Sequence, residues 1–168
     1  RPYREDDATG PPNAYGASKL AGEVYEARVV ANAERVVDLL LALAAHLPPA
    51  VDLALEDART GREWRGVDVA LPDVREALAR LKVPLATYGG VELAVYSTDD
   101  QLTVTPDLEL YAFARTDRWL YILQGKGLVE ATQPAADPWP LRPEDLGEAP
   151  ELADALAAIV ERLALEPA

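Results

Sequence analysis

Tyr15 and Lys19 are the pair of side chains whose types and spacing suit proton transfer. A phenol and an ammonium four residues apart lie on one face of the chain if the segment is helical. The lysine charge would then lower the pKa of the phenol, so that the tyrosine can pass a proton to or from a carbinol oxygen. The pair by itself is unspecific, because two residues at this spacing often occur by chance.

The sequence around this pair is more specific. The strings PYREDD (residues 2–7) and GPPNAYGASKLAGE (residues 10–23) closely resemble the catalytic segment of extended short-chain dehydrogenases. The nearest group is that of the dTDP-4-dehydrorhamnose reductases, which reduce a keto-sugar nucleotide with NAD(P)H. The resemblance implies that Tyr15 is the proton donor and that Lys19 binds the nicotinamide ribose and tunes Tyr15. It covers residues 1–23 only.

The cofactor-binding part of that family is not found in the sequence. The glycine-rich turn that places a pyrophosphate at a helix N-terminus should lie upstream of Tyr15, as should a catalytic Ser or Thr. We therefore expect no bound cofactor and no active reductase, so Tyr15 and Lys19 are catalytic residues by resemblance only. The chain is expected not to be an enzyme by itself.

Few other residues suit catalysis or metal binding. There is no cysteine, which excludes thiolate nucleophiles and disulfides, and the single histidine, His46, excludes multi-histidine metal sites. His46 precedes two prolines after an apolar stretch, where it suits a helix C-terminus better than catalysis. The GKG string at residues 125–127 lacks the rest of a phosphate loop. The acidic pairs at residues 99–100 and 144–145 lack calcium-loop spacing, so no metal is expected.

The hydrophobic pattern predicts an α+β fold. A helix is expected from Asn13, as its N-cap, through Leu47. Alternation then predicts a hairpin of strands at residues 51–56 and 63–71, followed by a short helix from Pro72. Gly89-Gly90 is a hairpin signal that begins a meander of about four strands, the last at residues 119–123. The predicted fold is an antiparallel sheet, a hairpin plus a four-strand meander, with helices on one face.

Two regions are expected along the chain. Residues 1–31 form a reductase-like arm and helix start, and residues 32–168 form a single α+β domain. That domain contains a proline-rich connection at residues 125–150 and a terminal helix at residues 151–165. Four explanations of this arm stay open: a fusion, a gene remnant read through into its neighbour, a piece of a longer protein, or simply an extended arm followed by the start of a helix.

The aromatic side chains of the predicted meander have two interpretations. They alternate with other residues, and such rows commonly form half of a core. The aromatic residues concerned are Tyr96, Tyr111, Phe113, Trp119 and Tyr121. If Glu109, Tyr111 and Phe113 face outward instead, they form a patch suited to a protein partner.

The charge restricts the possible partners. Asp and Glu number 29 against 16 Lys and Arg, a net charge of −13, which argues against nucleic acid as a partner. The longest apolar stretch, residues 36–47, is too short to span a bilayer, and residues 1–12 do not read as a signal peptide. We expect a bacterial, cytoplasmic, non-catalytic binding or adaptor domain, with a basic protein as its partner. The alternatives are an acidic surface that serves solubility alone, and a fragment of a sugar-nucleotide reductase.

Overall fold

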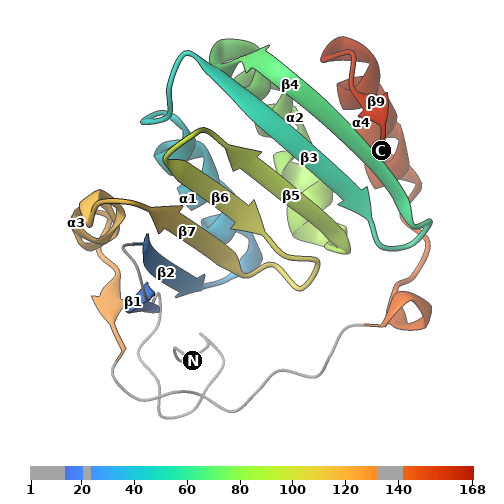
Figure 1. The fold of residues 1–168 in the computed structure, drawn as a ribbon. Helices are drawn as coiled ribbons and strands as arrows, with labels where there is room; N and C mark the ends of the chain where they lie inside the picture. Colours follow the sequence, from blue (N-terminus) through green and yellow to red (C-terminus); the bar gives the residue numbers. More distant parts are fainter. Residues whose placement is uncertain (1–13, 21–23, 132–141) are drawn as a thin grey trace.

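A computed structural model describes residues 14–20, 24–131 and 142–168 of the chain. The described part contains a sheet with the strand order β8-β1-β2-β7-β6-β5-β3-β4-β9 (Figure 1). Neighbouring strands are antiparallel, except that β1 and β8 are parallel. The strands are β1 (Ala14–Leu20), β2 (Val24–Val30), β3 (Ala50–Asp57), β4 (Arg62–Ala70), β5 (Val91–Tyr96), β6 (Asp100–Val104), β7 (Leu110–Ala114), β8 (Val129–Glu130) and β9 (Glu166–Pro167). The helices are α1 (Ala33–Ala44), α2 (Leu71–Tyr88), α3 (Arg118–Gly125), α4 (Pro150–Arg162) and the short 3-10 helix η1 (Pro143–Asp145).

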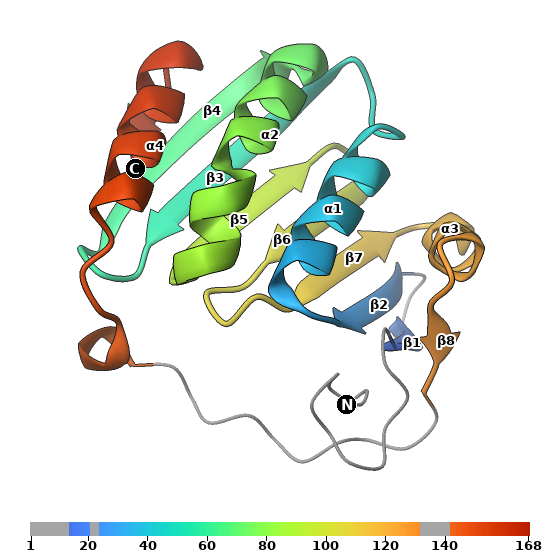
Figure 2. The ribbon, with the colours of Figure 1, turned by 180° about the vertical axis from the view of Figure 1, so that it is seen from behind.

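The long helices lie on one face of the sheet. Seen from behind, α1, α2 and α4 stand side by side across the strands, whereas the opposite view shows the strands in front of them (Figures 1 and 2). The predicted α+β class, with an antiparallel sheet and helices on one face, is therefore confirmed. None of the helices in the described part of the chain is both long and apolar enough to cross a membrane.

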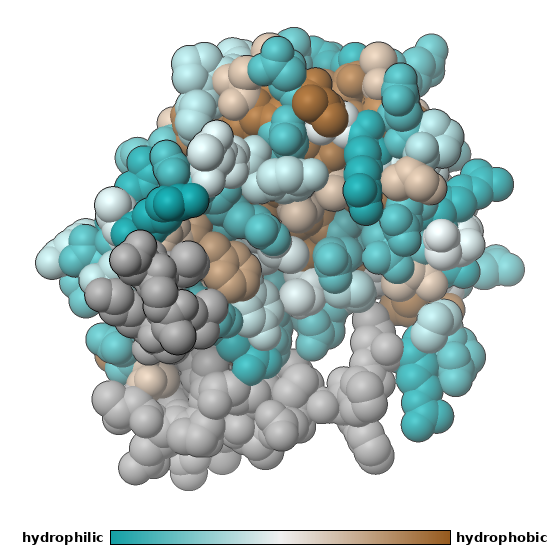
Figure 3. All heavy atoms as spheres, in the orientation of Figure 1, coloured by the Kyte–Doolittle hydropathy of each residue, from teal (hydrophilic) through white to brown (hydrophobic). Residues whose placement is uncertain are grey.

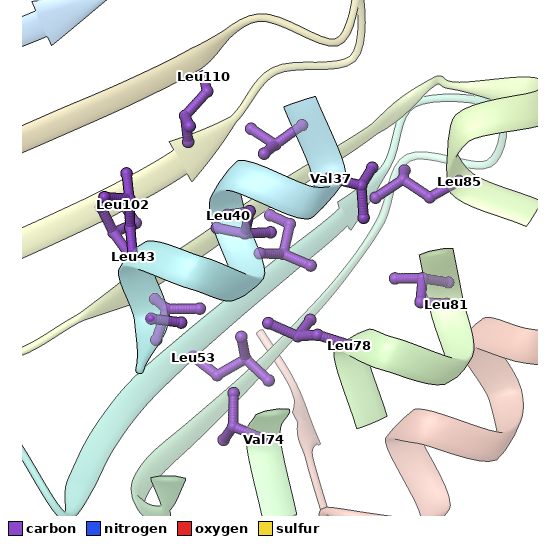
Figure 4. Packing of buried hydrophobic residues seen from close by; sticks show 14 of the residues in the cluster. Val37, Leu40, Leu43, Leu53, Val74, Leu78, Leu81, Leu85, Leu102 and Leu110 are labelled. Carbon is purple, nitrogen blue, oxygen red and sulfur yellow. The ribbon is translucent and has the colours of Figure 1, made fainter. Parts of the chain in front are cut away.

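The hydrophobic core fills the space between this helical layer and the sheet. Figure 4 shows side chains of α1 and α2 meeting those of the strands. The labelled members of this cluster are Val37, Leu40, Leu43, Leu53, Val74, Leu78, Leu81, Leu85, Leu102 and Leu110, each at most 2% exposed. Burying a side chain of this size contributes about 1.5–3 kcal/mol, so alternate strand residues are held firmly toward the helices.

The predicted helix at residues 13–47 is wrong over most of its N-terminal part. Residues of this segment form β1 and β2, and the helix is only α1, whose N-cap is Asn32; Asn13 lies outside the described residues. The Asn32 Oδ1 accepts a hydrogen bond from the Arg35 backbone N–H at 2.9 Å. Pairing with β7 and burial of Ala27 and Val29 outweigh helix propensity in β2. The sheet therefore continues across the predicted boundary at residue 31.

Two further local predictions are wrong. The fourth meander strand, expected at residues 119–123, is α3, in which Trp119 and Leu123 are both buried one helical turn apart. Gly89-Gly90 does not turn a hairpin, because α2 runs as far as Tyr88 and the two glycines lead directly into β5. Their φ angles of 57° and 76° suit glycine, so the signal marked a helix end rather than a strand turn. The hairpin of β3 and β4 and the terminal helix α4 are confirmed.

Candidate binding face of the sheet

The face of the sheet opposite α1, α2 and α4, called the open face, is made by alternation along the strands. In β3, β5, β6 and β7 every second residue is buried against the helices, and the residues between them are exposed or half-buried. Figure 3 views this face and shows pale and brown residues among hydrophilic ones over the strands. The open-face residues used below are Arg28, Ala54, Glu56, Glu63, Arg65, Glu92, Ala94, Tyr96, Gln101, Thr103, Tyr111 and Phe113.

Tyr111 and Phe113 lie on the open face rather than in the core. Both are half-buried, whereas their neighbours Leu110, Ala112 and Ala114 are at most 1% exposed. The two rings stack with centroids 6.3 Å apart and planes 11° apart. Such a pair presents a rigid apolar surface, because each ring holds its neighbour in place.

Glu109 directly precedes β7 and is buried, at 4% exposed. The Arg28 guanidinium donates to its Oε2 through Nε at 2.9 Å and also through Nη2. The guanidinium also lies 5.5 Å from the centre of the Tyr111 ring. Burial raises the pKa of the Tyr111 hydroxyl, against the opposing effect of Arg28. The Glu109 carboxylate is therefore held in an ion pair with Arg28, and the Arg28 guanidinium supports the Tyr111 ring from one side.

Tyr15 and Lys19 do not have the helical arrangement that the reductase resemblance implies. Both lie on β1, which pairs with β2 on one side and β8 on the other. Four residues of strand separate two Cα atoms by about 13 Å, about twice the separation across a helical turn. The one-turn helical spacing from which the proton-transfer role was argued is therefore absent at Tyr15 and Lys19.

The other candidate residues have structural roles. In the GKG string at residues 125–127, which lacks the rest of a phosphate loop, Gly125 ends α3 and the Lys126 carbonyl accepts from the Arg35 guanidinium. Asp99 and Asp100 form ion pairs with arginines at 3.2 and 2.7 Å, and residues 144–145 lie exposed in η1. His46 is exposed just after α1, edge-on to the Trp119 ring at 6.4 Å. Within the described residues no group of three or more acidic or histidine side chains has a metal-binding arrangement.

A row of three glutamates was missed by reasoning from the sequence. Glu63, Glu56 and Glu92 lie directly opposite one another across β4, β3 and β5. All three are exposed. No local sequence motif predicts this row, because only the register of the three strands brings the glutamates together. Beside the row is a hollow of about 110 Å³, lined by Ala54, Leu55, Glu56, Glu63, Trp64, Arg65, Glu92 and Ala94.

A larger hollow, of about 510 Å³, lies next to this one, where β9 pairs with β4 at the end of the sheet. It is lined by Glu63, Arg65, Gly66, Val67, Ala164, Glu166, Pro167 and Ala168. Its charged groups are carboxylates and one guanidinium, without a nucleophile and base in contact. It extends the acidic character of the open face around the edge of the sheet.

Comparison with known proteins does not assign the chain to a family. No family model, no curated protein and no solved structure matches it, so its function is argued from its own residues.

Proposed function

We propose that this chain is a non-catalytic acidic module that binds a protein partner through the open face of its sheet. The observation that carries the proposal is the stacked, half-buried pair of Tyr111 and Phe113 on a face that α1, α2 and α4 leave uncovered. Aromatic side chains are enriched at the centres of protein interfaces, where a rigid ring gives a large contact area at a small entropic cost.

The charge of the chain indicates what kind of partner it binds. With a net charge of −13, its field attracts a basic surface and repels nucleic acid and other acidic molecules. Attraction of this kind speeds encounter and is screened over about 10 Å at moderate salt. Association with the partner is therefore expected to slow as salt rises, whereas a surface that serves only solubility shows no specific partner at any salt.

The test is affinity capture from a bacterial lysate by the purified chain and by a double variant, Tyr111→Ser with Phe113→Ser. The variant is expected to retain at most about one tenth of a specifically captured protein, because truncating central aromatic residues costs about 2 kcal/mol or more. Val83→Ser is the matched control, since Val83 is 71% exposed on α2 at the helical side.

Two results would refute the proposal. If the double variant remains folded by circular dichroism and captures the same proteins as the unmodified chain, the open face is not the binding surface. If nothing is captured reproducibly and a metabolite screen finds a tight ligand instead, the chain is not a protein-binding module.

A further inference from the structure

The open face has a depression with a small-residue floor over β3, β4 and β5. Along one row across the sheet, Tyr111 of β7 is followed by Thr103, Ala94 and Ala54 on β6, β5 and β3, and then by Arg65 on β4. The small side chains of this row, two alanines and a threonine, thus lie between the long side chains of Tyr111 and Arg65. Along the strands, Tyr96 stands in the next row on one side.

The other side of the depression is closed by the glutamate row. Glu56 and Glu92 directly flank the alanine pair, and Glu63 continues the row on β4. Neighbouring strands are about 4.8 Å apart, so three carboxylates share a narrow strip of surface. Like charges directly opposite each other across strands destabilise a sheet. Among the described residues, no hydrogen bond or ion pair to another side chain offsets this repulsion.

The size of the hollow indicates what it accepts. Its volume of about 110 Å³ falls well below the roughly 300–1,000 Å³ typical of metabolite pockets. It has room for about four water molecules at ~30 Å³ each, which suits one side chain of a partner. Long basic side chains lay an aliphatic stem along apolar surface and keep the charged head among polar groups. Ala54 and Ala94 offer such a floor, and the glutamate row offers the counter-charge.

We propose that this depression, the acidic hollow, receives an arginine or lysine side chain from a basic segment of the protein partner. The inference rests on the proposed function and names the chemistry of its partner. The stem lies on Ala54 and Ala94, and the charged head contacts Glu56, Glu63 and Glu92. Three carboxylates outnumber the single guanidinium of Arg65 on the rim, so the hollow takes a cation, and its volume of about 110 Å³ limits it to one side chain. The Tyr111–Phe113 stack then contacts the adjacent apolar part of the same segment.

The test uses the full chain and a fluorescein-labelled peptide of alternating arginine and threonine, with binding followed by fluorescence anisotropy at low and moderate salt. The triple variant Glu56→Gln, Glu63→Gln, Glu92→Gln is expected to bind about tenfold more weakly, the combined effect of three exposed ion contacts. Ala94→Leu fills the floor without changing the charge, and it is expected to weaken binding as well. A peptide of alternating glutamate and threonine is expected not to bind.

The control removes the same charge from the helical side, by Glu34→Gln, Asp154→Asn and Glu161→Gln on α1 and α4, where all three residues are exposed. This variant is expected to bind the arginine peptide nearly as well as the unmodified chain. Equal weakening by both triple variants, or unchanged binding by Ala94→Leu, shows that binding depends only on the overall negative charge of the chain. Either result refutes the proposal that a basic side chain binds in the acidic hollow.

The two proposals fail in different ways. If a captured partner is lost by the Tyr111→Ser, Phe113→Ser variant but kept by the glutamate triple variant, protein binding stands and the acidic hollow is not its contact. If the partner is lost by both variants and kept by both controls, the hollow and the stack form one docking surface.

Discussion

Replacing Arg59 by alanine is expected to destabilise the fold and to loosen the acidic row. Arg59 lies in the turn between β3 and β4, and its guanidinium donates hydrogen bonds to three backbone carbonyls. These are Tyr88 O at 3.0 Å, Gly89 O at 2.7 Å and Gly147 O at 2.9 Å. Tyr88 ends α2, so two of these acceptors belong to the helix end, where carbonyls have no partner within the helix.

The magnitude follows from the burial of these bonds. Hydrogen bonds that involve a charged group contribute about 1.5–3 kcal/mol each. The bonds to Tyr88 and Gly89 are partly buried, whereas the bond to Gly147 is exposed and water replaces it at little cost. Water also reaches part of the first two carbonyls once the side chain is gone, so we expect Arg59→Ala to cost about 2 kcal/mol in total. For a chain of this size that lowers Tm by roughly 4–8 °C.

The assay is urea unfolding followed by tryptophan fluorescence. With a slope of about 2 kcal/mol per molar urea, the expected loss moves the midpoint by about 1 M. Arg62→Ala is the matched control, because Arg62 is an exposed arginine at the end of the same turn, and its effect is expected to be within about 0.5 kcal/mol.

The hydrogen bonds of the Arg59 guanidinium also have a functional consequence. Glu56 and Glu63 lie on the two sides of the Arg59 turn, and Glu92 follows Gly90, whose carbonyl accepts from the Ala58 N–H at 2.9 Å. Arg59→Ala is therefore expected to weaken binding of the arginine peptide even under conditions where the chain stays folded. If Arg59→Ala unfolds at the same urea concentration as Arg62→Ala, the guanidinium contacts do not hold this corner of the fold, and the reasoning is wrong.

Two further predictions concern the cofactor and the effect of pH. Titration of the chain with NADPH is expected to give no saturable quenching of tryptophan fluorescence at sub-millimolar cofactor, because the sequence contains no glycine-rich turn of the kind that holds a dinucleotide pyrophosphate. Tight saturable quenching contradicts this prediction. The Tyr88 hydroxyl donates to Glu151 Oε2 at 2.7 Å, and this hydrogen bond lowers the pKa of Glu151 below its usual 4.5. Its stabilising contribution is therefore present above about pH 4.5 and is lost as pH falls through the lowered pKa. The difference in urea midpoint between the unmodified chain and Tyr88→Phe is expected to shrink over that acid range, and a difference that is constant with pH contradicts it.

Local sequence patterns were sufficient for some elements and misleading for others. The alternation of β3 and the apolar stripe of α4 are complete within their own residues, and both were predicted correctly. The segment of α3 was assigned to the wrong class because Trp119, Tyr121 and Leu123 fit a strand period, while Trp119 and Leu123 equally fit a helical turn. A short apolar run does not distinguish the two, and only packing against β7 decides.

In the candidate site, too, the sequence predicted some features and the packing of the sheet decided others. The sequence singled out Glu109, Tyr111 and Phe113 but left open whether they face the core or the solvent, since alternation defines two faces without saying which one the helices cover. The structure decides this through Leu110 and Ala112, which pack beneath the helices and leave Tyr111 and Phe113 on the other side. Glu109 differs from both, because its ion pair with Arg28 depends on the pairing of β2 with β7.

The sequence by itself determined the α+β class, the acidity of the chain and the absence of cysteine and multi-histidine chemistry, because these depend on composition and on the period of the apolar residues. Only the tertiary structure decided that residues 14–30 are strands and that Glu56, Glu63 and Glu92 share one row. The physical reason is that strand register is set by side chains on the buried face. Leu53, Leu55 and Leu93 pack against the helices, and the residues between them are placed as a consequence.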